Sequence, residues 1–175
     1  MIRYFPRIAA LILPLLLASC GADPVRPVAA PVPPPSVAPP APPVSASTDW
    51  RDQPLTAGAW RYVTGTPLSA ARYGTADATA FALQCDAATR RITLLRSGTA
   101  TEMTITTSSR TARLPAGSVV DRGNTMTAVI LNATDTLLDA MAFSRGRVMI
   151  ASPGLPTVIV PAWTEITRAI EDCRK

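Results

Sequence analysis

Apolar and polar residues alternate in short stretches along the C-terminal part of this 175-residue chain. A period of two is typical of half-buried β-strands, and it predicts strands at 60–63, 81–85, 92–94, 101–107, 125–131, 147–151 and 157–160. Turn-forming residues lie between these stretches, at Gly98, Gly117-Ser118, Gly123-Asn124, Arg145-Gly146 and Pro153-Gly154. Short strands separated by frequent turns predict a mainly β fold, an antiparallel β-sandwich or small barrel.

Two stretches follow a helical period instead. At 134–143, Thr134 is a capping residue ahead of apolar residues at helical spacing, which predicts a helix of two turns. At 161–172, Pro161 suits a first helical turn, and Trp163 lies on one apolar face with the isoleucines that follow it. The second stretch predicts a C-terminal α-helix.

The first residues have the layout of a secretory signal peptide. Two arginines precede the apolar run 8–17, which is too short to span a bilayer as a helix. The run ends in Leu17-Ala18-Ser19-Cys20, which resembles the lipobox of bacterial lipoproteins. The resemblance implies that 1–19 is removed and that Cys20 carries a diacylglycerol and an N-acyl chain such as palmitate. The alternative is a secreted protein with a spare thiol.

The residues after Cys20 indicate which membrane holds the anchor and how the anchor is joined to the folded domain. In many Gram-negative lipoproteins an aspartate directly after the cysteine retains the protein in the inner membrane, whereas Gly21 follows Cys20 here. We therefore expect the outer membrane, with the folded domain in the periplasm. Ten of the 26 residues in 21–46 are proline. Such a segment favours extended polyproline II and reaches roughly 80 Å at about 3.1 Å per residue. We interpret 20–46 as a tether, with a proline-recognition ligand as the alternative, and 47–175 as one globular domain.

Composition excludes several classes of chemistry. The chain has no histidine, and its only lysine is Lys175, so catalytic triads and buried amines are excluded. Residues 47–175 contain 14 basic and 11 acidic residues, a net charge of +3 that is too small to argue for nucleic acid. Without a CxxC motif or a histidine, we expect no metal site and no cofactor.

The two remaining cysteines form an even pair in an oxidising compartment. Cys85 shares a strand face with Phe81 and Leu83, and Cys173 shares the apolar face of the terminal helix. We expect a disulfide between Cys85 and Cys173, and two buried thiols are the alternative.

Candidate functional groups are few. Asp135 and Asp139, and Glu165 with 171–172, are the only carboxylate groupings for acid/base catalysis, and a solvated helix face is the alternative. Four arginines near predicted turns could bind a lipid phosphate or a cell-wall carboxylate, unless they are simply solvated: Arg90, Arg91, Arg145 and Arg147. Three tryptophans could stack on sugars, although core positions suit Trp60 and Trp163 better.

Several segments resemble known exported proteins. FALQCD at 81–86, the stretch 154–163 and the ending 170–174 resemble uncharacterised lipoproteins of Gram-negative bacteria. The ending is more distantly similar to the invasion-associated locus B group of exported proteins. The strand around Cys85 is similar to one in the membrane-bound inhibitors of C-type lysozyme, small β-barrel lipoproteins. Their Ser-Gly-Ala-type loop is replaced here by 107–111, and their Trp-Lys-Gly stretch has no counterpart.

Taken together, these features indicate a non-enzymatic envelope lipoprotein with a binding or structural role. Its expected partners are the membrane, through Cys20, and peptidoglycan or an envelope protein. An inhibitor of an envelope hydrolase such as lysozyme is one alternative. A weak carboxylate-dependent hydrolase around Asp135 and Asp139 is another.

Replacing the lipidated cysteine tests the anchor. We expect Cys20→Ala to abolish labelling with radioactive palmitate and to block removal of 1–19, because both steps require the thiol. Gel mobility and membrane fractionation measure these outcomes. A processed, membrane-bound Cys20→Ala protein would refute the lipobox assignment.

Overall fold

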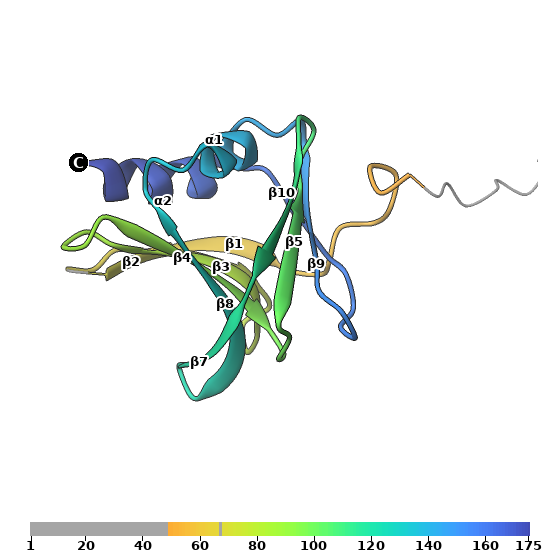
Figure 1. Ribbon diagram of the computed structural model, residues 1–175, viewed down its shortest axis with the longest axis horizontal. Coiled ribbons are helices and arrows are strands. Elements are labelled where there is room, and N and C mark those ends of the chain that lie inside the picture. The colour runs from red at the N-terminus through yellow and green to blue at the C-terminus, as the bar shows by residue number, and fades with distance from the viewer. Residues whose placement is uncertain (1–48, 67) are drawn as a thin grey trace, which may run out of the picture. The chain divides into compact units, whose positions relative to one another are not determined.

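Ten strands and two helices make up the part of the chain that the computed structural model describes, residues 49–66 and 68–175. These residues belong to one compact unit, Val44–Lys175. The strands are β1 (Ala59–Val63), β2 (Leu68–Gly74), β3 (Thr79–Asp86), β4 (Arg91–Ser97), β5 (Glu102–Thr106), β6 (Thr111–Pro115), β7 (Gly117–Asp121), β8 (Asn124–Asn132), β9 (Arg147–Ala151) and β10 (Val158–Pro161). The helices are α1 (Thr136–Ala142) and α2 (Thr164–Arg174) (Figure 1).

The strands form two antiparallel sheets. The larger has the order β1-β2-β3-β4-β8-β7, and the smaller has the order β10-β9-β5-β6. Neither sheet closes into a barrel, and α2 is the last element. The prediction of a mainly β, antiparallel fold with a C-terminal helix is confirmed, and the two open sheets correspond to its sandwich form.

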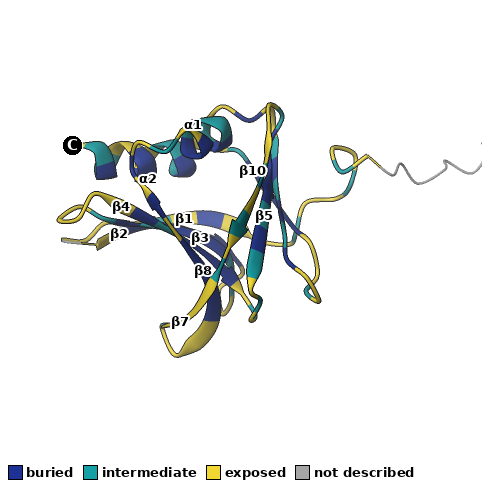
Figure 2. Cartoon of the chain, viewed as in Figure 1, coloured by how far each residue is buried: buried dark blue, intermediate teal, exposed yellow. Residues whose placement is uncertain are grey.

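One hydrophobic core lies on the inner face of the six-stranded sheet. Alternation along β3 turns Phe81, Leu83 and Cys85 to this face, and each is at most 1% exposed. The four-stranded sheet covers one part of the face, and α2 lies against β2 and β3 on another part (Figures 1 and 2). The core therefore joins both sheets and both helices.

Three strands, β2, β6 and β7, were not predicted from the sequence. β2 has no alternation of burial, because all of its residues after Leu68 are buried. β6 and β7 are short edge strands with few buried side chains, so their apolar pattern is weak.

One turn assignment is wrong as well. Gly117-Ser118, expected to be a turn, begins β7. The real turn between β7 and β8 is Arg122-Gly123, where both residues have positive φ, 51° and 80°. Two successive positive φ angles are what a tight two-residue hairpin turn requires.

Both predicted helices exist, with shifted starts. Asp135, rather than Thr134, caps α1, and its Oδ1 accepts a hydrogen bond of 2.8 Å from the Leu137 amide. Pro161 ends β10 instead of starting α2. Trp163 precedes α2 in an extended conformation and is 55% exposed, so its expected place on the core face is wrong.

A disulfide joins the terminal helix to the large sheet. The sulphur atoms of Cys85 on β3 and Cys173 on α2 lie 2.24 Å apart, with their Cα atoms 5.5 Å apart. The structure thus brings together the two cysteines that the sequence pairs. Ile166, Ala169 and Ile170 of α2 are buried on the same side.

The predicted signal peptide 1–19, Cys20 and the tether 20–46 lie outside the described residues. Within residues 49–66 and 68–175, no helix has the length and hydrophobicity needed to cross a bilayer.

Removing the disulfide should destabilise the domain and release its C-terminus first. The bond spans 88 positions, and closing such a loop in the unfolded chain is worth on the order of 4–5 kcal/mol in the chain-entropy model. We expect Cys173→Ser to lower the melting temperature of the full chain in detergent markedly. Amide exchange should rise in α2 before it rises in β3. Unchanged stability and uniform exchange would show that the apolar face of α2 suffices to hold it.

Candidate functional site

The outer face of the six-stranded sheet, opposite the core, carries a groove. One row of residues that pair across the strands forms its middle, running Arg61, Arg72, Ala82, Leu95, Ala128 and Gly117. The residues of this row after Arg72 are small or aliphatic, so their side chains leave space above the sheet. Ala82, Leu95, Met126 and Ala128 form a second buried cluster there. We call this feature the outer groove.

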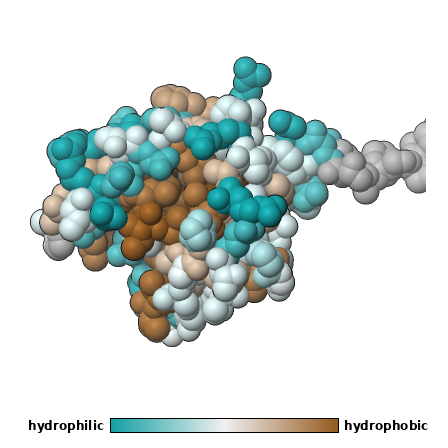
Figure 3. Space-filling model, in the orientation of Figure 1, coloured by the Kyte–Doolittle hydropathy of each residue, from teal (hydrophilic) through white to brown (hydrophobic). Residues whose placement is uncertain are grey.

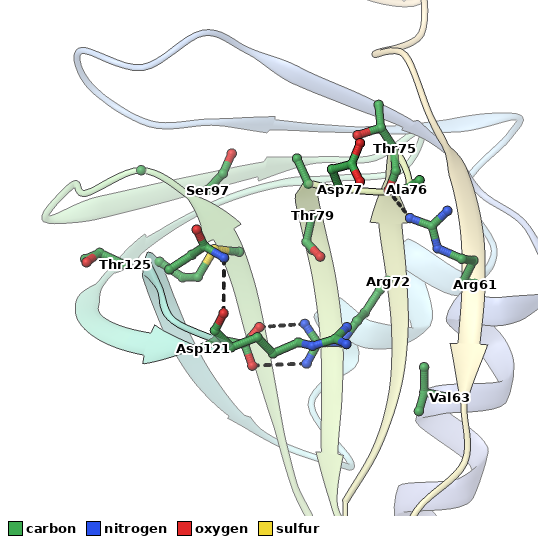
Figure 4. A pocket seen from close by; sticks show the side chains of 15 residues that line it. Arg61, Val63, Arg72, Thr75, Ala76, Asp77, Thr79, Ser97, Asp121 and Thr125 are labelled. Carbon is green, nitrogen blue, oxygen red and sulfur yellow. Dashed lines mark hydrogen bonds and ion pairs between the residues drawn. The ribbon is translucent and has the colours of Figure 1, made fainter.

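An ion pair bridges the outer groove. Arg72 on β2 and Asp121 at the end of β7 make two hydrogen bonds, of 2.6 and 3.0 Å, and their side chains are only 10% and 14% exposed. Three strands separate β2 from β7 in the sheet. The two side chains can meet only because the sheet curls outward and brings β7 back across its own face. Figure 4 shows them pointing toward one another.

The bridge divides the outer groove into two hollows that share Asp121. The larger, of about 710 Å³, lies at the end formed by the β2–β3 and β7–β8 turns, and its lining includes Thr79 and Ser97. The smaller, of about 290 Å³, lies toward Leu68 and is partly apolar through Val119 and Val120. A volume of 300–1,000 Å³ is typical of small-ligand sites, so the larger hollow is the candidate functional site.

Two arginines lie directly opposite each other at the start of this site. Arg61 on β1 pairs in register with Arg72 on β2, an arrangement of like charges that is unfavourable by itself. The bridge to Asp121 neutralises Arg72. Arg61 instead donates hydrogen bonds to the carbonyls of Thr75 and Gly74, so its guanidinium remains a net positive charge beside the hollow (Figure 4).

Two further charges complete the site. Arg122 and Asp77 are exposed residues of the two turns that border the larger hollow. Neither side chain makes a hydrogen bond or ion pair within residues 49–66 and 68–175. The larger hollow therefore offers a free guanidinium, a free carboxylate and the carbonyl-bound Arg61, a set that suits a polar ligand with both acidic and hydrogen-bond-donating groups.

None of these residues is among the candidates that the sequence predicts. Arg61 and Arg72 interrupt otherwise apolar strands at outward positions, which is a weak signal on its own. Arg122 is the first residue of the β7–β8 turn, but the turn was predicted one position later, at Gly123-Asn124. Asp121 lies 49 positions from Arg72, and no local pattern relates them.

The four arginines proposed from the sequence lie in two separate places. Arg90 and Arg91 are at the β3–β4 turn, where Arg90 donates to the backbone carbonyl of Arg174. Arg145 and Arg147 follow α1, where Arg147 donates to the Gln53 carbonyl at 2.5 Å. No hydrogen bond or ion pair within the described residues links the two pairs, and two of the four guanidiniums already bind carbonyls.

Three of the carboxylates considered for catalysis, Asp135, Asp139 and Asp172, have structural contacts, whereas Glu165 Oε2 is buried without a hydrogen-bond partner among the described residues. Asp135 caps α1, and Asp139 makes an ion pair of 2.9 Å with Arg174. Lys175 Nζ, at 2.6 Å, and then the Tyr62 hydroxyl hold the pKa of Asp172 below its usual value. Burial, followed by this contact with Asp172, raises the pKa of Tyr62. These contacts fasten α1 and α2 to each other and to β1.

Two tryptophans have different environments. Trp60 is 6% exposed, packs edge-on against Tyr73, and donates its indole N–H to the Pro161 carbonyl at 2.8 Å. It is a core residue, as expected. Trp163 is exposed on the surface, where it does not adjoin the larger hollow.

Comparisons with known proteins identified no similar protein. No protein-family model, no curated protein and no solved structure matches the chain. Within the described residues, no three side chains of cysteine, aspartate or glutamate gather as metal ligands would.

Breaking the bridge should destabilise the domain more than breaking an exposed ion pair. Asp121→Asn leaves the partly buried Arg72 without its counter-charge, and we expect a loss of about 1–3 kcal/mol in the free energy of unfolding. The matched control is Glu102→Gln, which removes the exposed 3.4 Å ion pair with Arg113 between β5 and β6. We expect at most about 0.5 kcal/mol there. Chemical denaturation measures both, and equal losses would contradict the structural role of the bridge.

Proposed function

We propose that this protein is a non-enzymatic envelope lipoprotein that binds peptidoglycan through the larger hollow of the outer groove. The observation that carries the proposal is that Arg122 and Asp77, which have no side-chain partner among the described residues, lie beside the positive Arg61 in a hollow of about 710 Å³. This site is polar, open and positively charged, in contrast to the apolar cavities that hold lipids.

The chemistry of peptidoglycan fits this charge arrangement. Its stem peptides carry carboxylates, amides and amino groups close together. A carboxylate can accept two hydrogen bonds from the planar guanidinium of Arg122, with Arg61 adding positive potential. An amino group or an amide N–H can donate to Asp77. The glycan hydroxyls can use the threonine and serine side chains at the border of the hollow, Thr75, Thr79, Ser97 and Thr125.

The expected anchor and tether suit such a role. A lipid on Cys20 would hold the chain at the outer membrane. The tether 20–46 would let the domain move up to roughly 80 Å from the bilayer surface. A binding domain on a long tether links the membrane to the wall without needing a fixed distance between them.

Two observations support a non-enzymatic role. Asp135, Asp139 and Asp172 are engaged in a helix cap, an ion pair and a tyrosine contact, which leaves them poorly placed for proton transfer. In the larger hollow, Asp121 is held by Arg72, and Asp77 is the remaining carboxylate. General acid/base hydrolysis of glycosides uses two carboxylates in different protonation states.

Co-sedimentation with purified peptidoglycan sacculi tests the proposal. We expect the full chain in detergent to pellet with the sacculi, and Arg122→Ala with Arg61→Ala to weaken the apparent affinity about 10- to 100-fold through the loss of charge-assisted hydrogen bonds. Arg113→Ala is the matched control, because it removes an exposed arginine of β6 on the other sheet. Its affinity should equal that of the unaltered protein.

The same preparations separate the alternatives. Inhibition of lysozyme without binding to sacculi would favour the hydrolase inhibitor. Release of soluble fragments from the sacculi, lost in Asp139→Asn, would favour the hydrolase. Equal binding by all arginine variants would refute the outer groove as the binding site.

A further inference from the structure

Arg96 on β4 is a charged residue inside the sandwich. It is 1% exposed and is the largest of the fully buried side chains in the described part of the chain. It lies two positions after Leu94 and four after Ile92 on β4, so its side chain points to the inner face as theirs do, away from the outer groove. Its neighbours across the sheet are Phe81 on β3 and Thr127 on β8, neither of which carries a charge.

Only one nitrogen of this guanidinium has a partner. Nη2 donates to the Pro156 carbonyl, in the turn between β9 and β10. Nε and Nη1 are buried and make no hydrogen bond within residues 49–66 and 68–175. None of the ion pairs among these residues includes Arg96, so no carboxylate balances its charge.

A buried guanidinium without a counter-charge is energetically unfavourable. Removing an ion from water carries a large free-energy penalty even after relaxation, and one hydrogen bond to a neutral carbonyl offsets a small part of it. Burial lowers the pKa of Arg96 accordingly. Arginine nevertheless stays protonated in proteins, so the fold needs a negative charge beside it.

The turn between β9 and β10 closes this end of the sandwich. A Cβ built on Gly98 would lie 2.9 Å from the Leu155 side chain, so the turn packs tightly on the end of β4. Ser152, where the turn begins, is 7% exposed, and its hydroxyl is buried without a partner among the described residues. The turn thus supplies a second buried hydrogen-bond donor at the end of the sandwich where Arg96 lies.

We propose that the Arg96 guanidinium binds one small inorganic anion, chloride, between the two sheets. Arg96 is 1% exposed and lines neither hollow of the outer groove, so its guanidinium lies apart from the candidate peptidoglycan site. A monovalent halide neutralises the charge and accepts hydrogen bonds from Nε or Nη1. Because it is spherical, it accepts these bonds from any direction. The site is separate from the groove and does not depend on the proposed function.

Stability measured at constant ionic strength tests the site. Thermal and chemical unfolding of the full chain in detergent are followed while sodium chloride replaces sodium gluconate at fixed pH. A single site predicts that each tenfold rise in chloride above the dissociation constant raises the ratio of folded to unfolded protein about tenfold. Bromide should replace chloride, and an anomalous-scattering peak in bromide-soaked crystals should lie within hydrogen-bond distance of Arg96.

Variants separate this site from general salt effects. Arg96→Met removes the buried charge with an apolar side chain of similar length, so its stability should not respond to chloride. Arg91→Met is the matched control, because it removes an exposed arginine of the same strand and should keep the full response.

Two outcomes would overturn the proposal. One is equal stability of the unaltered protein in chloride and gluconate, and the other is a chloride response that persists in Arg96→Met. If Arg96→Met does not fold, the bromide peak in crystals of the unaltered protein decides, and its absence at Arg96 overturns the proposal.

Discussion

Burial of the inner face of the six-stranded sheet is the constraint on which the rest of the structure depends. Six strands present more apolar surface than the four-stranded sheet can cover. The two helices cover the remainder, with Leu138 of α1 and Ile170 of α2 both fully or almost fully buried. Because α2 ends the chain, its attachment is a weak point, and the Cys85–Cys173 disulfide fastens it to the centre of the sheet. The disulfide and the hydrophobic core therefore both hold α2 against the six-stranded sheet.

Curvature of the large sheet produces the outer groove. Twisted sheets curl as strands are added, and here β7 comes back far enough for Asp121 to reach Arg72 on β2. The bridge then buries Ala82 and Leu95 on a face that would otherwise be exposed to water. Small residues in the floor and charged residues at the rim leave two hollows. The candidate binding site thus results from the shape of the sheet rather than from a dedicated loop.

The two faces of the sheet place charge in opposite ways. On the outer face, Arg61 and Arg122 keep their charges near solvent, where a ligand can reach them. On the inner face, Arg96 is buried and makes no ion pair with a carboxylate of the described residues. A charge near solvent is available for recognition, whereas a buried one must be balanced permanently. This difference is why we assign a macromolecular ligand to one face and a small inorganic ion to the other.

The sequence by itself determined the elements whose signals are local. Alternation of apolar residues was enough for the seven predicted strands, including β3 and β8. Helical spacing was enough for α1 and α2, and the residue faces already placed Cys85 and Cys173 in the core. The lipid anchor is predicted from the residues up to Cys20, and the tether is predicted from the proline content that follows. Both remain predictions. Each of these conclusions needs only neighbours within a few positions of the chain.

Only the tertiary structure decided the rest. β2 had no alternating pattern because both of its faces are covered, and that burial comes from strands distant in sequence. Trp163 looked like a core residue until the real start of α2 placed it outside. The meeting of Arg72 with Asp121 depends on how far the sheet curls, and the isolation of Arg96 depends on which residues surround it. Periodicity reports which side of an element is apolar, but it does not report which distant charge, if any, lies opposite.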